Sequence, residues 1–296
     1  MNQVPIFEAM KNSILAYDLN AEFKQLALTY LDTKKQSPLI FGELCLLHYR
    51  EFCSNYDENI IQIASAMELL ILGSDILDDL QDNDQKNSWC ERYDIASNIA
   101  VSYFFLAMHI IANSNMTYQQ HAIQLVHPYC LKSIQGQHVD LTNNSRSEED
   151  YLQMIQQKSG ALTALACQLG CVMATGQKNN RVEQYASIIG MIQQINNDLF
   201  DLEAVERQHD IIHKKYTLPI IYFLSCSNDA VQQLKSYYEQ TSKEINLQQL
   251  HEQIQSSGAI HYTFVQKKLL EFQAITIISK QELSNQSKNY LKMLLK

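Results

Sequence analysis

The stretch Glu68-Leu-Leu-Ile-Leu-Gly-Ser-Asp75-Ile-Leu-Asp78-Asp79-Leu-Gln-Asp82 decides the fold of this chain. Seven of its 15 positions are Leu or Ile, and they surround the acidic residues on most sides, which is typical of a helix that is mostly buried. Its aspartates, Asp75, Asp78, Asp79 and Asp82, follow the i, i+3, i+4, i+7 spacing of one helical face. The sequence therefore predicts a mostly buried helix with one acidic face.

This acidic face needs a counter-charge. Carboxylates one helical turn apart repel each other, and no Lys or Arg lies within the face itself. Mg²⁺ suits such a face, because it binds one or two carboxylates and takes its other ligands from water and substrate phosphates. A solvated acidic helix face without a metal remains the alternative, since acidic strings of this kind are common.

A second polar cluster lies in Gln194-Ile-Asn-Asn197-Asp198-Leu-Phe-Asp201. Gln194 and Asp198 are one helical turn apart, and so are Asn197 and Asp201, so these groups share one side of a helix. We expect the two acidic helices to face each other across a cavity and to hold metal ions that bridge a diphosphate. An ordinary polar helix end is the alternative for this second cluster alone.

Basic residues that suit a diphosphate occur near the second cluster. Lys158 precedes an apolar run, which places it at a helix N-terminus and so at an expected anion site. Lys214 and Lys215 stand just before Thr217-Leu-Pro219, where another helix is expected to begin. The segment from Gln135 to Asp140 adds polar groups to an otherwise apolar helix.

Composition excludes several classes of protein. The 296 residues contain only 8 Gly and 4 Pro, too few for the turns of a β-sandwich, and no Gly-rich nucleotide-binding string occurs. The net charge of −9 argues against a nucleic-acid partner. The seven Cys are odd in number and contain no C-x-x-C pair, which favours reduced thiols and a cytoplasmic protein. We expect neither a signal peptide nor a transmembrane segment, because no basic start precedes an apolar run and no run of 18 apolar residues occurs.

Helical periodicity runs through the whole chain, and no linker of biased composition interrupts it. We predict one all-α domain over residues 1–296, with about ten to twelve helices. The most apolar helices, expected over 93–112, 160–175 and 184–205, are predicted to be buried near the centre of a large bundle.

Four motifs in this order resemble those of the trans-prenyl diphosphate synthase (polyprenyl synthase) family, over roughly residues 30–225. They are Asp78-Asp79-x-x-Asp82, Gly136-Gln-x-x-Asp140, Lys158-Ser-Gly and Gln194-x-x-Asn-Asp198-x-x-Asp201, the last followed by Lys215-x-Thr-Leu-Pro. The resemblance implies an isoprenoid synthase fold, helices bundled around a central apolar cavity, an allylic diphosphate substrate and a homodimer.

The resemblance also implies roles for individual residues. Two or three Mg²⁺ ions bind the two aspartate motifs, Lys158, Lys215 and Lys86 hold diphosphate, and Gln194 lies near the nascent allylic cation. The implied metal ligands are Asp75, Asp78, Asp79, Asp82, Asp198 and Asp201. The implied catalytic residues are Asp78, Asp79, Asp82, Lys158, Gln194, Asp198 and Lys215.

The departures from the family pattern concern the acceptor. Synthases that extend isopentenyl diphosphate carry a Gly-Lys-Arg-x-Arg-Pro string before the first motif and an Arg pair after it. Here Thr33-Lys34-Lys35-Gln-Ser-Pro38 and Asp84-Gln-Lys86-Asn87 stand in their place, and the whole chain has five Arg. Because Arg binds a diphosphate best, through paired hydrogen bonds, the site for a second diphosphate looks dismantled.

This pattern is similar to that of one branch, the ComQ-type isoprenyl transferases, and so are the stretches from Glu68 to Asp84 and from Gln135 to Ser145. The likeness implies transfer of a geranyl or farnesyl group to a tryptophan of a quorum-sensing pheromone precursor. Chain elongation with isopentenyl diphosphate remains the alternative. A class I terpene cyclase fits less well, because Asp201 and Val205 stand where its motif has Ser or Thr and Glu. A non-catalytic partner subunit also fits less well, because such subunits usually lose the aspartates that this chain keeps.

Overall fold

The computed structural model describes residues 3–82, 87–202, 209–227, 229–239 and 246–296. These residues form helices α1 to α15 with three short 3₁₀ or π segments, and no strand occurs among them, which confirms the predicted all-α class. The helices outnumber the ten to twelve expected, because the C-terminal third is divided into short helices such as α10 (His209–Ile212) and α13 (Leu247–Ser256).

The chain forms two compact units, and each unit draws on separated parts of the sequence. The first consists of Met1–Cys130 and Leu162–Glu183, and the second of Leu131–Ala161 and Gln184–Lys296. The single domain over 1–296 therefore stays a prediction. The first acidic motif lies in the first unit and the second lies in the second unit, and their approach across a cavity likewise stays a prediction.

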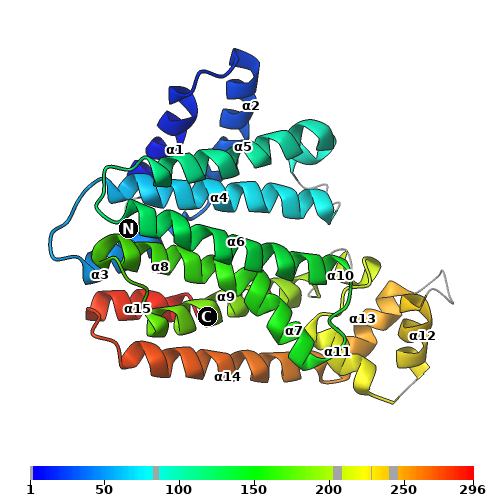
Figure 1. The fold of residues 1–296 in the computed structure, drawn as a ribbon. Coiled ribbons are helices and arrows are strands. Elements are labelled where there is room, and N and C mark those ends of the chain that lie inside the picture. The colour runs from blue at the N-terminus through cyan, green and yellow to red at the C-terminus, as the bar shows by residue number, and fades with distance from the viewer. Residues whose placement is uncertain (1–2, 83–86, 203–208, 228, 240–245) are drawn as a thin grey trace. The chain divides into compact units, whose positions relative to one another are not determined.

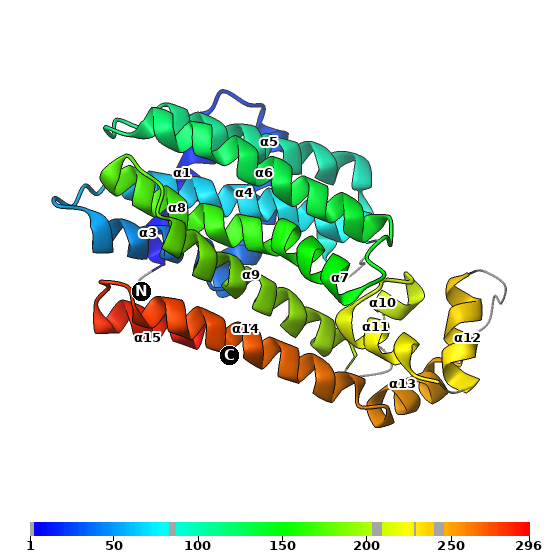
Figure 2. The ribbon, with the colours of Figure 1, turned by 60° about the horizontal axis from the view of Figure 1, so that its bottom comes forward.

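The first unit is built around α4 (Ile60–Gln81), the helix that carries the first acidic motif. Figures 1 and 2 both show α5 (Tyr93–Ala112) lying along α4, and α3 (Ile40–Phe52) and α1 (Val4–Ala16) also pack against it. Most of α4 is buried, as its apolar sequence predicts, and the less buried positions lie in its first turn and among the aspartates at its C-terminal end. The first unit is completed by α2 (Ala21–Asp32), the 3₁₀ segments η1 (Thr33–Gln36) and η2 (Ser88–Glu91), the start of α6 (Gln119–Leu141) and most of α8 (Ala161–Thr175).

The prediction that all three apolar helices are buried is wrong for α5. By length and composition both α4 and α5 could cross a membrane, but 72% of the apolar window of α4 is buried inside the protein against 33% of that of α5. The reason is that α5 packs on α4 with one face only. Phe105, on another face, is 73% exposed and borders an apolar groove of about 820 Å³ between α1, α2 and α5.

The second unit has two apolar clusters. One joins α7 (Glu148–Ile155), α9 (Asn180–Asp201) and α11 (Leu218–Ser225), with Tyr151 and Ile195 at its centre. The other lies around Phe223, where short helices meet. The first cluster includes Met191 and Ile195, which lie on the apolar side of α9. The remaining helices of this unit are α12 (Asp229–Tyr238), α14 (Ala259–Ser279) and α15 (Asn285–Met293).

The buried side chain of Glu68 links α4 to α3 and makes the stability of the protein depend on pH. Glu68 Oε1 accepts a hydrogen bond of 2.6 Å from the backbone N–H of Gly42, and burial raises the pKa of Glu68 to about 7. Between pH 4.5 and 7 the folded protein binds more protons than the unfolded chain, so stability falls as the pH rises.

We therefore expect Glu68→Gln to gain stability relative to the wild type across this pH range, by about 3 kcal/mol in total. Chemical denaturation at pH 5 and pH 8 measures this difference. Glu58→Gln, at an exposed position ahead of α4, controls for the substitution itself. A difference that does not change with pH would contradict the assignment.

Candidate active site

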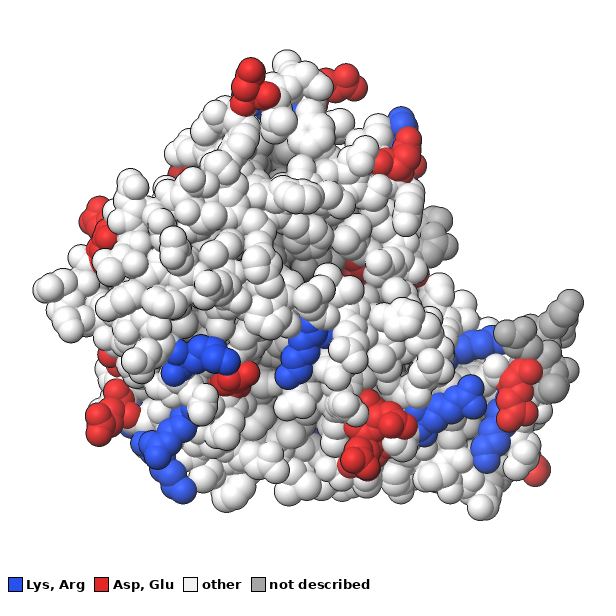
Figure 3. All heavy atoms as spheres, viewed as in Figure 1, with Lys and Arg blue, Asp and Glu red and all other residues white. Residues whose placement is uncertain are grey.

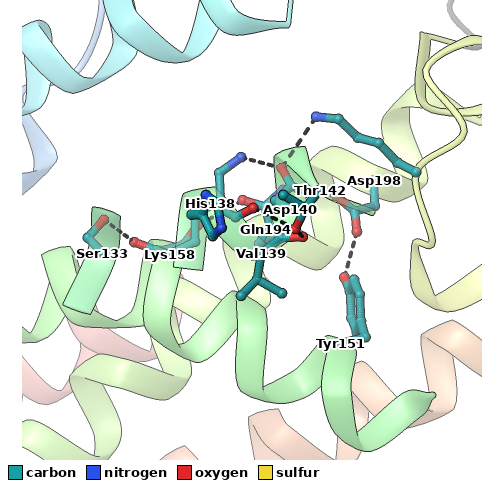
Figure 4. A network of polar contacts seen from close by, with 11 residues as sticks. Ser133, His138, Val139, Asp140, Thr142, Tyr151, Lys158, Gln194 and Asp198 are labelled. Carbon is teal, nitrogen blue, oxygen red and sulfur yellow. Dashed lines mark hydrogen bonds and ion pairs between the residues drawn. The ribbon is translucent and has the colours of Figure 1, made fainter. Parts of the chain in front are cut away.

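The centre of the candidate site in the second unit is a carboxylate shared by two lysines. Asp140 Oδ2 lies 2.8 Å from Lys158 Nζ and 3.4 Å from Lys215 Nζ. Figure 4 shows Asp140 and Lys158 within the network of polar contacts around this carboxylate. All three side chains are between 11 and 13% exposed. Burial opposes ionisation of Asp140, but the two ammonium groups outweigh it and hold the pKa of Asp140 below its usual value. The cluster therefore keeps one net positive charge, which suits an anionic ligand.

Lys158 is placed by a π-helical segment rather than by a helix N-terminus. The segment η3, Gln156–Gly160, continues α7 and leads directly into α8, so the backbone does not start a new helix at Lys158. The predicted helix-terminal anion site is therefore wrong. Single π turns inside α-helices are frequent at functional sites, because the extra residue changes where a side chain points.

Gly136 on α6 allows this segment to come close. A Cβ atom at position 136 would lie 2.3 Å from the backbone N of Lys158, which no real contact permits. Ser133, one turn earlier on α6, donates a hydrogen bond of 2.7 Å to the carbonyl oxygen of Lys158. The Gly-Gln-x-x-Asp motif thus positions Lys158 in two ways. Gly136 allows the close approach of its backbone, and Asp140 forms an ion pair with its ammonium group.

Lys215 is placed by a sharp turn after α10. Lys214 has a φ of 60°, the left-handed region that residues with side chains rarely adopt, so the chain reverses just before Lys215. The backbone N–H of Lys215 donates to the carbonyl oxygen of Asp210, and Tyr238 OH donates to the carbonyl oxygen of Lys215. Strained backbone held by its surroundings is typical of functional sites.

Asp198 is held by neutral donors. Tyr151 OH donates to Asp198 Oδ2 at 2.5 Å, and Gln194 Nε2 donates to Asp198 Oδ1 at 3.0 Å. Ser159 Oγ in turn donates to Gln194 Oε1 at 2.8 Å, so one chain of hydrogen bonds runs from the π segment to α9. Figure 4 shows Tyr151 pointing at this carboxylate from α7. Hydrogen bonding from both sides fixes the direction of the Asp198 carboxylate.

Asp210 is a site residue that the sequence did not reveal. Its backbone N–H donates to Asp201 Oδ2 at 3.0 Å. Burial and the nearby charges of Asp198 and Asp201 raise the pKa of Asp210 well above its usual value. Burial likewise raises the pKa of Asp198, to about 6. Carboxylate oxygens are the ligand type that a hard cation such as Mg²⁺ prefers, and such a cation would favour the ionised form of Asp210.

In the first unit, the first motif binds the only tryptophan of the chain. Asp79 Oδ2 accepts hydrogen bonds from Trp89 Nε1 at 2.9 Å and from Asn87 Nδ2 at 2.7 Å. Trp89 is 4% exposed and packs edge-on against Tyr30. Asp79 is therefore both part of the acidic face and an anchor for the segment that follows α4.

Asp75 has a counter-charge from another element. Lys34 in η1 lies 2.6 Å from Asp75 Oδ2. Burial lowers the pKa of Lys34, but Asp75, Glu68 and Asp79 together raise it by more, so the ammonium remains charged. No Lys or Arg lies within the acidic face itself, and this cation comes from a residue 41 positions earlier in the chain. The predicted diphosphate ligand Lys86 lies outside the described residues.

With this geometry in hand, comparisons with known proteins identify the family. The model of the family described as polyprenyl synthetase matches residues 38–254. This range includes both acidic motifs, Lys158 and Lys215. The chain belongs to the polyprenyl synthetase family. The resemblance drawn from the four motifs is thereby confirmed.

Two relatives within the polyprenyl synthetase family are similar to this chain over nearly its whole length. The tryptophan prenyltransferase ComQ of Bacillus subtilis subsp. natto is 34% identical over 294 residues, covering 98% of this chain and 91% of that protein. The tryptophan prenyltransferase ComQ of Bacillus subtilis strain 168 is 30% identical over 295 residues, covering 96% and 95%.

Solved structures of polyprenyl synthetases share the fold at low sequence identity. The polyprenyl synthase of Caulobacter crescentus, solved with calcium and isoprenyl diphosphate, superposes with a TM-score of 0.86 at 16% identity, covering 99% of this chain and 92% of its own. The geranylgeranyl pyrophosphate synthase of Lactobacillus brevis gives a TM-score of 0.83 at 18% identity, covering 100% and 96%. The predicted isoprenoid synthase fold is confirmed.

The residues present fit the Mg²⁺ that this family generally uses. The clustering of Asp198, Asp201 and Asp210 gives oxygen ligands of the type that Mg²⁺ prefers. Among the described residues no three acidic, His or Cys side chains are placed so that together they could hold a metal ion. This is consistent with Mg²⁺ chemistry, because that ion usually takes one or two carboxylates and completes its shell with water and substrate phosphates.

The charge of the molecular surface does not by itself attract a diphosphate. The face of the molecule in Figure 3 shows acidic and basic side chains interspersed over a mainly uncharged surface. With a net charge of −9 the protein as a whole repels a diphosphate, so attraction has to come from the site itself. In the second unit, Lys158 and Lys215 place two positive charges close together beside Asp140.

Proposed function

We propose that this protein is a Mg²⁺-dependent prenyltransferase that ionises geranyl or farnesyl diphosphate and transfers the prenyl group to a tryptophan of a pheromone precursor peptide. The similarity to two tryptophan prenyltransferases along nearly the whole chain carries this proposal. The polar centre of the second unit supports it, because its lysines and carboxylates are the groups that a metal-bound diphosphate requires.

Each group has a role in the proposed reaction. Bound Mg²⁺, in two or three ions, would neutralise the charge that builds on the departing diphosphate. The proposed ligands are Asp78, Asp79 and Asp82 in the first unit and Asp198 and Asp201 in the second, with Asp210 added from the geometry. Lys158 and Lys215 bind the diphosphate directly, and Gln194 lies beside the metal ligand Asp198.

The chemical step breaks the C–O bond between the prenyl group and its diphosphate. Diphosphate leaves with the bonding electrons, and the π electrons of the indole form a bond from C3 of the acceptor to the allylic cation. C3 then has four carbon substituents, and the positively charged indole becomes neutral by losing its N1 proton to solvent. Apolar surroundings protect this cation from water. A neutral indole needs no cationic binding site, and this agrees with the scarcity of Arg along the chain.

Condensation with isopentenyl diphosphate is the second candidate function. The short chain isoprenyl diphosphate synthase of Methanothermobacter thermautotrophicus is 30% identical over 187 residues, and this similarity supports the second candidate. That match covers 56% of this chain, whereas the tryptophan prenyltransferases match along nearly all of it. The fuller match favours the tryptophan acceptor.

The proposal also includes a cytoplasmic homodimer. A second copy would cover the exposed apolar face of α5, where Val101 and Phe105 are 44% and 73% exposed and border the apolar groove. The seven cysteines are free thiols in the structure, as a reducing compartment favours.

The deciding experiment offers both acceptors to the enzyme. We expect Mg²⁺-dependent transfer from labelled farnesyl or geranyl diphosphate to a tryptophan-containing peptide encoded beside the gene, detected by mass spectrometry, and no transfer to the peptide with Trp replaced by Phe. Isopentenyl diphosphate is expected to give little product. The buried Trp89 is the only internal tryptophan, so self-labelling does not obscure the assay. Efficient formation of longer prenyl diphosphates would refute the peptide acceptor and leave chain elongation.

A further inference from the structure

The ion pair between η1 and α4 bears on which acceptor the enzyme accepts. Lys34 Nζ and Asp75 Oδ2 are 2.6 Å apart, and the side chain of Lys34 is only 17% exposed. Asp75 lies one helical turn before Asp78 and Asp79, so this pair is about 5 Å along the helix axis from the proposed metal ligands. A ligand that binds at Lys34 would therefore lie beside the donor diphosphate.

The positive charge of Lys34 is already compensated by acidic side chains of α4. Besides Asp75, the carboxylates of Glu68 and Asp79 also interact favourably with its ammonium group. The next residue, Lys35, is paired as well, because its Nζ lies 2.8 Å from Asp32 Oδ1. Both basic side chains of η1 thus have an acidic partner within the protein.

We propose that Asp75 is a specificity-determining residue, which neutralises Lys34 and so disfavours any acceptor that carries a diphosphate. This inference rests on the proposed function, since it concerns the choice between a neutral indole and isopentenyl diphosphate.

Asp75 disfavours a charged acceptor for electrostatic reasons. A diphosphate that used Lys34 would have to break its 2.6 Å ion pair with Asp75, whose side chain is 48% exposed, and would then meet the carboxylate of Asp75 at short range. Repulsion between like charges grows as solvent is excluded. A neutral indole meets neither obstacle, so Asp75 penalises the charged acceptor alone. Rejection of a wrong ligand by a repulsive group is a common way to obtain specificity.

Asp75→Asn tests the proposal, because it removes the charge and keeps the size of the side chain. We expect the affinity for isopentenyl diphosphate, measured by calorimetry on the full-length enzyme with Mg²⁺, to increase about 10-fold or more, the gain of one charge-assisted hydrogen bond. Adding Lys34→Gln to this variant should abolish the gain. Asp32→Asn, which releases the exposed Lys35, is the matched control and should leave this affinity near that of the wild type.

Two outcomes would overturn the proposal. One is unchanged affinity for isopentenyl diphosphate in Asp75→Asn. The other is loss of Mg²⁺-dependent diphosphate release from farnesyl diphosphate with no gain in acceptor binding, which would make Asp75 a metal ligand, as its spacing first suggested. Failure of the proposed function appears separately, as a wild-type enzyme that does not prenylate the tryptophan peptide.

Discussion

Asp79→Asn is expected to lower turnover about 100- to 1,000-fold while leaving the melting temperature close to that of the wild type. The loss follows from the charge, because a neutral amide binds Mg²⁺ far more weakly than a carboxylate does. The fold is retained because the Asn side-chain oxygen can still accept the hydrogen bonds from Trp89 and Asn87. Release of diphosphate from farnesyl diphosphate at saturating Mg²⁺ measures the effect.

Asp79→Ala separates the two roles of this side chain. It should lose the same activity and also destabilise the protein by about 1–3 kcal/mol, because the N–H of the buried Trp89 loses its acceptor. Because Trp89 is the only tryptophan, its fluorescence reports on this hydrogen bond directly. Asp94→Asn, at an exposed carboxylate paired with Arg92, is the control. Unchanged turnover in Asp79→Asn would remove the first motif from the mechanism.

Gly136→Ala is the second substitution with a large expected effect. We expect it to destabilise the protein, whereas helix propensity alone predicts stabilisation. Ala normally stabilises a helix by about 1 kcal/mol relative to Gly. Here the added Cβ would lie 2.3 Å from the backbone N of Lys158, so the π segment has to move. We expect a loss of about 1–3 kcal/mol in stability. A shift of about 1 Å in Lys158 should also cost about 100-fold in turnover.

The neighbouring substitution Gln135→Ala provides the comparison, because Gln135 is exposed on the same helix. Thermal unfolding and steady-state turnover of the two variants give the result. A Gly136→Ala variant as stable and active as Gln135→Ala would show that the close approach of α6 to η3 is not required.

The sequence predicted the features that depend on local spacing. The acidic face of α4 follows from residues three and four positions apart, and the same rule placed Gln194 and Asp198 on one face of α9. The all-α class followed equally from periodicity and the scarcity of Gly and Pro. Such features need no knowledge of which distant elements meet.

The features that escaped prediction depend on contacts between distant residues. Lys34 and Asp75 are 41 positions apart, and Tyr151 and Asp198 are 47 apart. Asp210 is a single acid outside any regular spacing, so only its hydrogen bond to Asp201 reveals it. The π segment at Lys158 escaped because periodicity does not distinguish one π turn from the α-helix around it.

The interleaving of the two units has a consequence for folding during synthesis. The chain passes from one unit to the other after residues 130, 161 and 183, so no single cut separates them. Residues 131–161 emerge from the ribosome before the partners that bury them: Tyr151 and Ile155 pack with Ile195 and Leu218, which are made later. We infer that the apolar side chains of this segment stay uncovered during translation, and that the protein is best expressed whole rather than as halves.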